Sequence, residues 1–474
     1  MTQQGSNAEP GTFASLEAAV RQAYARDDRP WVIGYSGGKD STCALQLIWR
    51  ALSELPVAQR QKPVYVLSSD TLVETPIIID YIDRALADIN AAARDQQMPI
   101  SAHKVYPDIS DSFWVNLIGR GYPAPSRKFR WCTERLKIDP ANAFIKEKVA
   151  EFGEVVMVLG VRRAESATRA QVMALHRQQD SVFSRHSSLL GALVYTPVED
   201  LSLDDVWSYL LQGERPWGGD NRELLTLYRN AQSGECPLVV DTKTESCGKS
   251  RFGCWVCTVV TKDKAMEAMV DNGEEWLEPL LELRDFLAAT QDPSRKVEVR
   301  DFKRRNGTVT FVETRDAPIP GPYLLEFRRE ILSRLLKAQK EVAAGAPPGE
   351  AVILIQDAEL LEIQRIWKEE LGDWEDTVHT IVHECIGRKL PRAPSSDFQF
   401  GADDAQMLRA VCEEHELPVQ LLAELLNAER EVAGQKRRSS IHRRIESILG
   451  KEWRDLDAVM DERAERRKTS TAPR

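Results

Sequence analysis

The segment that most restricts the fold of this chain is Ser36-Gly-Gly-Lys-Asp-Ser-Thr42, because it separates two stretches of different periodicity. Before it, Trp31 to Ser36 is short and apolar, as expected of a buried strand. After it, Asp40 to Leu52 carries apolar residues at helical spacing. A strand, a glycine turn and a helix in this order predict the first β-loop-α unit of an α/β domain.

The same alternation continues through the first half of the chain. Strands are predicted at Val64 to Ser68, near Ala102 to Val105 and at Val155 to Gly160, with a further strand at Leu193 to Thr196. The apolar spacing of Pro76 to Asn90 predicts a helix between two of them. Continuous apolar strands that alternate with helices are typical of a parallel sheet covered on both faces. We therefore expect an α/β fold.

The glycine turn has the chemistry of an anion-binding loop. Two glycines allow several N–H groups to point into one concavity, and the following helix adds the partial positive charge of its N-terminus. Lys39 adds a full charge, but Asp40 follows it, so the pattern G-x-x-x-x-G-K-[ST] is not met. A glycine turn without a ligand is the alternative. The nucleotide-binding residues predicted here are Ser36, Gly37, Gly38, Lys39, Asp40, Ser41 and Thr42.

This loop resembles the PP-loop of ATP pyrophosphatases, which cleave ATP between the α and β phosphates and adenylate a substrate oxygen. Gly160-Val-Arg-Arg-Ala-Glu-Ser-Ala-Thr-Arg169 resembles a segment of the sulfonucleotide (PAPS) reductase family, as do Arg130 to Lys137 and Pro197 to Trp207. The resemblance implies ATP and Mg²⁺ as cofactors and catalytic roles for Lys39 and Asp40. Ligands of parallel sheets bind past the carboxyl ends of the strands. That position adds Asp70, Gly160, Arg162, Arg163, Ser166 and Arg169 to the nucleotide site, although a surface salt-bridge cluster would also explain the arginines.

Four of the eight cysteines lie within 22 residues, at Cys236, Cys247, Cys254 and Cys257. Their spacing, C-x10-C-x6-C-x2-C, suits four thiolates around one metal centre, and both zinc and a [4Fe-4S] cluster fit. Four unrelated buried thiols are the alternative. The segment from Cys247 to Met266 resembles the DndC family of sulfurtransferases from bacterial DNA phosphorothioation systems, and the resemblance implies an iron–sulfur cluster at these four positions.

The resemblance implies a reaction as well. ATP would activate a phosphate oxygen of DNA with release of pyrophosphate, and sulfur from a cysteine desulfurase would replace that oxygen. The implied partners are DNA and the other phosphorothioation proteins, including an ATPase. The catalytic cysteine segment of true sulfonucleotide reductases is missing. Glu384-Cys-Ile-Gly387 is only weakly similar to it and lies on a predicted helix.

Cys132 is the candidate for sulfur transfer. It lies between Arg130 and Arg135, and cations next to a thiol lower its pKa and favour the nucleophilic thiolate. We therefore expect Cys132 to be catalytic. A buried structural cysteine is the alternative.

The net charge of −10 means that any attraction to DNA must come from local patches. Arg295 to Arg305 and Lys436 to Arg444 are such patches, although a solvated charged face is the ordinary explanation. Asn306-Gly307 predicts a hairpin over Lys296 to Val312.

Five parts are expected along the chain. They are a disordered N-terminus (1–14), a PP-loop domain (15–215), an iron–sulfur lobe with a basic hairpin (216–330), a helical region (331–468) and a disordered tail (469–474). The longest apolar stretch, Val155 to Val161, is far shorter than the roughly 20 residues that cross a bilayer. Since the N-terminus also lacks the features of a secretory signal, we expect a cytoplasmic protein without a membrane partner.

Two other functions remain open at this point. A tRNA thiolase also combines a PP-loop with a cluster and a persulfide. A non-enzymatic iron–sulfur scaffold that binds DNA and senses ATP would show the same motifs.

Overall fold

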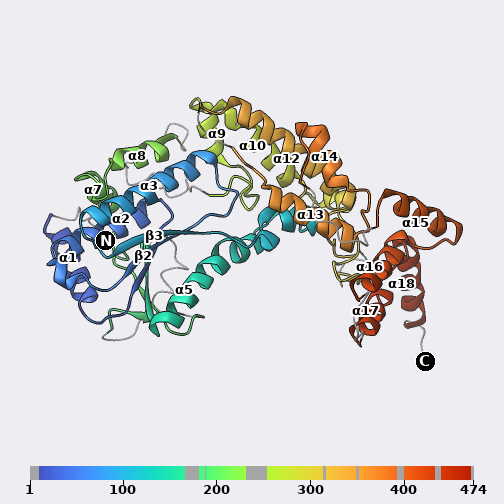
Figure 1. The fold of residues 1–474 in the computed structure, drawn as a ribbon, viewed down its shortest axis with the longest axis horizontal. Helices are drawn as coiled ribbons and strands as arrows, with labels where there is room; N and C mark the ends of the chain where they lie inside the picture. Colours follow the sequence, from blue (N-terminus) through green and yellow to red (C-terminus); the bar gives the residue numbers. More distant parts are fainter. Residues whose placement is uncertain are drawn as a thin grey trace. The chain divides into compact units, whose positions relative to one another are not determined.

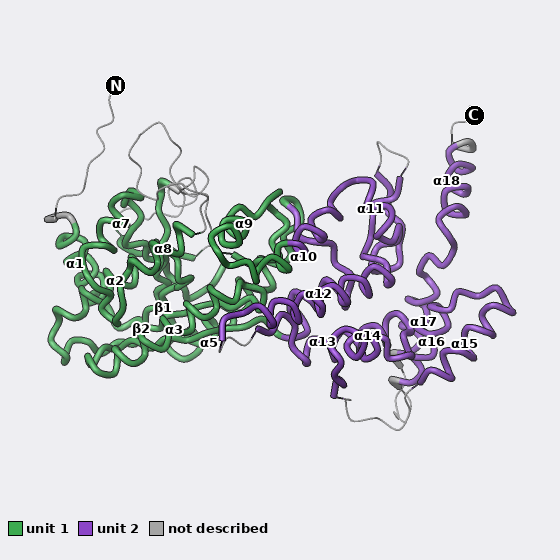
Figure 2. The backbone as a smooth tube through the Cα atoms, turned by 90° about the horizontal axis from the view of Figure 1, so that it is seen from above, with its two compact units in different colours: residues 1–108, 127–281 green, residues 109–126, 282–474 purple. Residues whose placement is uncertain are grey.

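The computed structural model describes residues 10–165, 181–186, 188–230, 253–312, 317–348, 352–391, 400–432 and 439–470 of the 474-residue chain. The chain divides into two compact units, one of residues 1–108 and 127–281 and the other of residues 109–126 and 282–474 (Figure 2). The predicted domain ranges, with boundaries at 215 and 330, stay predictions because a division by contacts does not test which parts fold independently. No helix of the described residues is long and apolar enough to cross a membrane.

The first unit is built on a six-stranded sheet (Figure 1). Its strands are β1 (Trp31–Gly34), β2 (Val64–Ser69), β3 (Ile100–Val105), β4 (Val155–Leu159), β5 (Ser184–Arg185) and β6 (Ala192–Tyr195). The spatial order is β3-β2-β1-β4-β6-β5, and all neighbours are parallel except β5, which runs antiparallel to β6. The predicted α/β fold is confirmed, including the strand expected at Leu193 to Thr196.

Helices cover both faces of this sheet. Those that contribute to the larger core are α1 (Pro10–Tyr24), α2 (Lys39–Ser53), α3 (Pro76–Asp95), α7 (Leu203–Leu211) and α8 (Asn221–Asn230). On the opposite face lies α5 (Asp139–Phe152) (Figure 1). The alternation of side chains along β1 explains the two layers, because Trp31 and Ile33 join the core of α2 whereas Val32 packs with Ile145 of α5.

Outside the sheet layers, this unit also contains α4 (Trp131–Thr133), α9 (Lys264–Asp271) and the start of α10 (Glu278–Ala289), which continues into the second unit. The capping box predicted at Ser202 is present, since the Ser202 hydroxyl accepts from the amide of Asp205. The prediction that residues 1–14 lack structure is wrong from Pro10 onward, because α1 begins there and buries Phe13 in the core.

The second unit is mainly helical, as expected for the C-terminal part of the chain. Its helices are α11 (Pro293–Val299), α12 (Leu325–Gly345), α13 (Asp357–Glu370), α14 (Thr377–Ile386), α15 (Ala402–Glu414), α16 (Val419–Val432), α17 (Ser439–Leu449) and α18 (Leu456–Ser470). The segment 109–126 joins them through a π-helical turn at Val115–Gly119, where the Trp367 indole donates to the carbonyl of Ile118 at 3.0 Å. Residues 469 and 470 are helical, so the predicted tail begins too early.

The predicted hairpin over Lys296 to Val312 is wrong in both arms, because residues 293–299 are helical and residues 308–312 form no strand, only an isolated bridge of Phe311 with Pro318. Asp292 caps the amide of Ser294 and Pro293 occupies the first turn, so residues 293–299 form α11 in spite of their β-branched valines. The turn itself is present, since the Gly307 amide donates to the carbonyl of Arg304 and Gly307 has φ +79°. A strong helix start has overridden the strand propensity.

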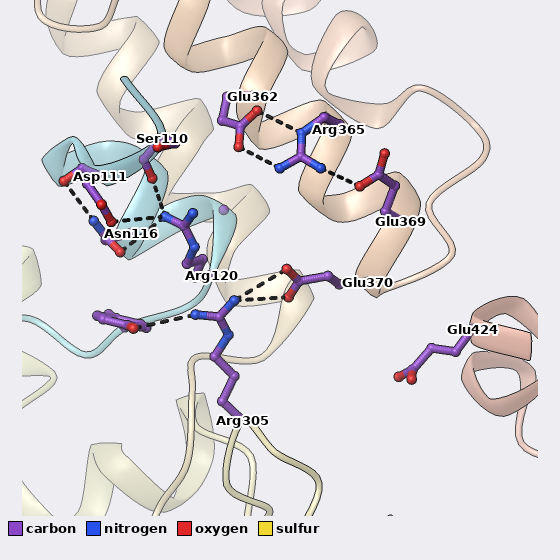
Figure 3. Close-up of polar contacts among 12 residues, drawn as sticks. Ser110, Asp111, Asn116, Arg120, Arg305, Glu362, Arg365, Glu369, Glu370 and Glu424 are labelled. Atoms are coloured by element: carbon purple, nitrogen blue, oxygen red, sulfur yellow. Dashed lines mark hydrogen bonds and ion pairs between the residues drawn. The ribbon is translucent and has the colours of Figure 1, made fainter. Parts of the chain in front are cut away.

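The basic residues of this segment are partly neutralised. Figure 3 shows Arg305 next to Glu370, and the guanidinium lies 3.3 Å from the carboxylate. The same figure shows Arg365 of α13, which is outside this segment, between Glu362 and Glu369. Arg300 donates to the carbonyls of Pro320 and Gly321 instead. The patch at Arg295 to Arg305 therefore presents less free charge than its sequence suggests, and its role with DNA stays a prediction.

Candidate functional site

The predicted phosphate loop connects β1 to α2 at the carboxyl edge of the sheet. Gly37 has φ +70°, and a Cβ there would lie 3.1 Å from Ile82, so glycine is needed for both its conformation and its space. Gly38 is the N-cap of α2 and offers no side chain to its first turn. The helix N-terminus therefore has the exposed backbone polarity that favours an anion.

The hydroxyl groups of the loop shape it from within. Ser41 donates to the carbonyl of Gly38 at 3.0 Å and accepts from the amide of Ser36 at 3.3 Å. The Ser36 and Ser41 hydroxyls lie 3.2 Å apart. Thr42 is fully buried, so its side chain supports the loop from below. These contacts stabilise the turn that the two glycines permit.

Three charged side chains meet beside the loop. Arg162 donates to one carboxylate oxygen of Asp40 at 2.6 Å, and the ammonium of Lys39 lies 3.1 Å from the other. Their side chains are only 5%, 14% and 9% exposed, respectively. Because two cations share one carboxylate, the cluster keeps a net positive charge in a site with little water, where it would attract a phosphate.

Gly160 allows this cluster to form. A Cβ at Gly160 would lie 2.5 Å from the carbonyl oxygen of Asp40 and 2.8 Å from the Cα of Ser41. The end of β4 therefore reaches the start of α2 only because residue 160 has no side chain. In the structure Gly160 serves the close packing of two backbones, which also brings Arg162 to Asp40.

The remaining nucleotide-site predictions have different outcomes. Arg163 pairs with Glu199 at 2.6 Å and Asp200 at 3.1 Å, and its role in the nucleotide site stays a prediction. Asp70 pairs with Lys104 at 2.9 Å and accepts from the amide of Leu72. Ser166 and Arg169 lie outside the described residues.

The second half of the cysteine segment attaches to the same edge of the sheet. Cys254 forms an isolated antiparallel bridge with Glu74, in the loop after β2, and the amide of Trp255 donates to the carbonyl of Val73 at 3.0 Å. The Cys254 sulfur lies 3.3 Å from the Thr71 hydroxyl and 3.6 Å from a Glu74 carboxylate oxygen. The predicted metal segment thus contacts the loop after β2, and the predicted nucleotide loop follows the neighbouring parallel strand β1.

Half of the predicted metal ligands can be described. The amide of Cys257 donates to the carbonyl of Cys254 at 3.0 Å, which makes the turn that lets two thiols converge. Trp255 and Val256 are buried beside them and would exclude water from a cluster. Cys236 and Cys247 lie outside the described residues, and the residues that are described contain no cluster of three or more metal-ligand side chains. The donors present fit a cluster, and the iron–sulfur quartet stays a prediction.

Cys132 lies close to this segment on α4. Lys137, which follows it, pairs with Glu74 at 3.4 Å and so joins the α4 region to the loop after β2. Burial raises the pKa of the Cys132 thiol, and the neighbouring charge of Cys257 raises it further, while Lys137 lowers it. The expected lowering of this pKa by adjacent cations is wrong in direction, because burial outweighs them. The position of Cys132 beside Cys257 is what supports its predicted role.

Sequence reasoning missed several residues of the site. Glu74 accepts from Thr71 at 3.0 Å and from Lys137 at 3.4 Å, and the spacing of Thr71 and Glu74 after a strand could have indicated it. Tyr228 lies against the phosphate loop from α8, 189 residues along the chain from Lys39. No local pattern could have pointed to that contact.

Comparison with protein families identifies two regions of the chain. Residues 30–259 match the phosphoadenosine phosphosulfate reductase domain. Residues 403–450, which comprise nearly all of α15, α16 and α17, match a small protein found in certain Dnd DNA modification systems. The first match covers the whole sheet together with the described cysteines Cys254 and Cys257.

Individual relatives are distant. An uncharacterized protein of Methanocaldococcus jannaschii is 27% identical over 198 residues, which is 42% of this chain and 35% of that protein. The chain thus spans about a third of the length of the curated relative that it matches. One similar solved structure is FMN adenylyltransferase of Candida glabrata in complex with FAD and inorganic pyrophosphate. It is 13% identical to this chain, the match covers 52% of this chain and 74% of that one, and the TM-score is 0.29. The U34-tRNA thiolase NcsA of Methanococcus maripaludis with its [4Fe-4S] cluster is 12% identical, covers 60% and 81%, and has a TM-score of 0.27.

Proposed function

We propose that this chain, whose residues 30–259 match the phosphoadenosine phosphosulfate reductase domain, is an ATP-dependent sulfurtransferase that replaces a non-bridging oxygen of a DNA phosphate with sulfur. The observation that carries the proposal is the bridge between Glu74 and Cys254, which attaches the cysteine segment to the sheet edge that also bears the phosphate loop. This contact supports the proposal that nucleotide and sulfur chemistry take place at neighbouring strand ends of one unit.

The first step activates DNA. A phosphate oxygen of DNA attacks the α-phosphorus of ATP, the bond to the β-phosphate oxygen breaks, and pyrophosphate leaves. Lys39 and Arg162 neutralise charge that develops on the leaving phosphates, and Asp40 fixes both cations by accepting from them. Mg²⁺ bound with ATP would neutralise part of the phosphate charge; Asp40 and Asp70 are both paired with cations of the protein.

The second step transfers sulfur. A cysteine desulfurase delivers sulfane sulfur to Cys132 as a persulfide, and the terminal sulfur attacks the activated phosphorus while AMP leaves. A thiol then attacks Cys132, the bond between the two sulfurs breaks, and its electron pair stays on the transferred sulfur, which gives DNA phosphorothioate and a disulfide. Cys132 is placed for this step by Lys137, whose ion pair with Glu74 joins its segment to the loop after β2.

The metal centre and the partners belong to the same proposal. An iron–sulfur cluster at Cys236, Cys247, Cys254 and Cys257 would cross-link the cysteine segment to the sheet. DNA binds as substrate, and the match of residues 403–450 supports joint action with other proteins of a Dnd modification system, including its ATPase.

Two measurements on the full-length protein test the proposal. Purified protein with ATP, DNA, a cysteine desulfurase and cysteine should release pyrophosphate in a DNA-dependent manner. Mass spectrometry of nuclease-digested DNA should then find sulfur-bearing dinucleotides. Sulfur in tRNA instead of DNA would identify a tRNA thiolase. DNA binding without pyrophosphate release would identify a scaffold.

A further inference from the structure

A tyrosine of α8 lies directly against the phosphate loop, although no motif includes it. The Tyr228 hydroxyl accepts from the backbone amide of Lys39 at 3.4 Å. The ammonium of Lys39 lies 5.3 Å from the centre of the Tyr228 ring. A Cβ at Gly38 would lie 3.3 Å from the same hydroxyl, so the second glycine of the loop also leaves room for it. Both the backbone and the side chain of Lys39 thus touch one residue.

The tyrosine is fixed by its own surroundings. Tyr228 is 6% exposed, and its ring packs edge-on against Trp207 of α7, with 5.4 Å between ring centres. The first residue of α8, Asn221, is fully buried and donates to Gln46 of α2 and to the carbonyl of Leu210, both at 2.8 Å. Because α8 is anchored to the helix that follows the loop, Tyr228 is a rigid platform and not a mobile surface group.

A lysine that meets phosphate needs such a platform. The side chain of Lys39 is long and flexible, and the Asp40 carboxylate with which it pairs is shared with Arg162. An aromatic face within about 6 Å attracts an ammonium and restricts where it can lie. Apart from the pair with Asp40, the ring of Tyr228 supplies this restraint for Lys39.

We propose that Tyr228 is a positioning residue of the nucleotide site, whose ring places the Lys39 ammonium and whose hydroxyl accepts from the Lys39 amide. The proposal rests on the proposed ATP chemistry and adds to it a residue from α8. The ring, more than the hydroxyl, carries the effect, since the ring acts on the charged group that faces the reacting phosphates.

The test compares two variants at this position in the full-length protein. Tyr228→Leu removes the ring, and Tyr228→Phe removes only the hydroxyl. Tyr195→Leu is the matched control, because Tyr195 is also a buried tyrosine of this unit and packs on Trp31 of β1. The first readout is the rate at which acetic anhydride modifies Lys39, measured by mass spectrometry without any nucleotide. The second is kcat and KM for pyrophosphate release.

Loss of the ring should free the lysine. In Tyr228→Leu, Lys39 should be acetylated several-fold faster than in the wild type. The variant should also lose about tenfold in kcat, a loss within the range of one cation–π contact. Its KM for ATP should change less than twofold. Tyr228→Phe should recover most of kcat and keep the slow acetylation. Tyr195→Leu should lower the melting temperature through lost packing but match the wild type in both readouts.

Two results would overturn the proposal. Unchanged acetylation of Lys39 in Tyr228→Leu would show that the ring does not restrain the ammonium. Equal losses of kcat in the Phe and Leu variants would assign the effect to the hydroxyl. If acetylation follows the proposal while even the wild-type protein releases no pyrophosphate, the positioning role stands and the proposed ATP chemistry fails.

Discussion

Replacing Gly160 by alanine tests the close approach on which the nucleotide site depends. The new methyl group would lie 2.5 Å from the carbonyl oxygen of Asp40, 2.7 Å from its carbonyl carbon and 2.8 Å from the Cα of Ser41. All three are backbone atoms of the first turn of α2, so no side chain can rotate away. Forcing one extra methyl group into a packed interior costs roughly 1–3 kcal/mol. The strain can be relieved only by moving α2 and β4 apart.

This movement would affect function as well as stability. It would stretch the 2.6 Å contact between Arg162 and Asp40, because Arg162 follows residue 160 by two positions. We therefore expect Gly160→Ala to lower the free energy of unfolding, measured in urea, and to reduce pyrophosphate release at a temperature where the variant is still folded.

Gly34→Ala is the matched control. Its Cβ would lie 3.4 Å from a methyl group of Leu159, an ordinary contact at the neighbouring strand end. This variant should change the free energy of unfolding by less than half as much. If Gly160→Ala had wild-type stability and wild-type pyrophosphate release, the argument from backbone contact would be refuted.

Three further substitutions test other parts of the account. Cys132→Ser should keep ATP binding and any iron–sulfur absorbance but stop the appearance of sulfur in DNA; normal modification by this variant would make Cys132 a packing residue. Burial lowers the pKa of Lys62 from 10.5 to about 8, against the opposing effect of Asp27, so the unfolded chain binds more protons than the folded one between these pH values. The free energy of unfolding of the wild type in urea, relative to Lys62→Met, should therefore rise from pH 8 toward pH 10. A constant difference over that range would contradict burial as the cause of the lowered pKa. Asn427 of α16 is buried and donates to two carbonyls near the end of α13, those of Lys368 and Glu369. Asn427→Ala should therefore lower the free energy of unfolding by about 1–3 kcal/mol. A loss smaller than that of the exposed control Gln420→Ala would contradict this prediction.

The sequence predicted those parts of the fold that depend on local patterns. The strand, glycine turn and helix around Gly37 were recognisable because the apolar periodicity changes there and a positive φ needs glycine. The capping box at Ser202 likewise lies within four consecutive residues. In both cases every interacting group is close along the chain.

Contacts between distant segments were beyond sequence reasoning. The lowered pKa expected for Cys132 rested on neighbouring arginines, whereas burial and Cys257, 125 residues away in the sequence, decide its direction. The ion pair of Asp40 with Arg162 and the contact of Lys39 with Tyr228 depend on how β4 and α8 pack on the loop. At α11, Asp292 and Pro293 start a helix where alternating valines had suggested a strand, so a local signal was present and was given too little weight.

The most direct test of the central claim is the transfer of labelled sulfur into DNA. Full-length protein would be incubated with ATP, DNA, a cysteine desulfurase and ³⁴S-cysteine, and the digested DNA would be analysed by mass spectrometry. The account predicts ³⁴S-phosphorothioate dinucleotides in proportion to the pyrophosphate released, and neither product with Lys39→Ala. Labelled DNA formed without ATP, or by Lys39→Ala at the wild-type rate, would contradict it.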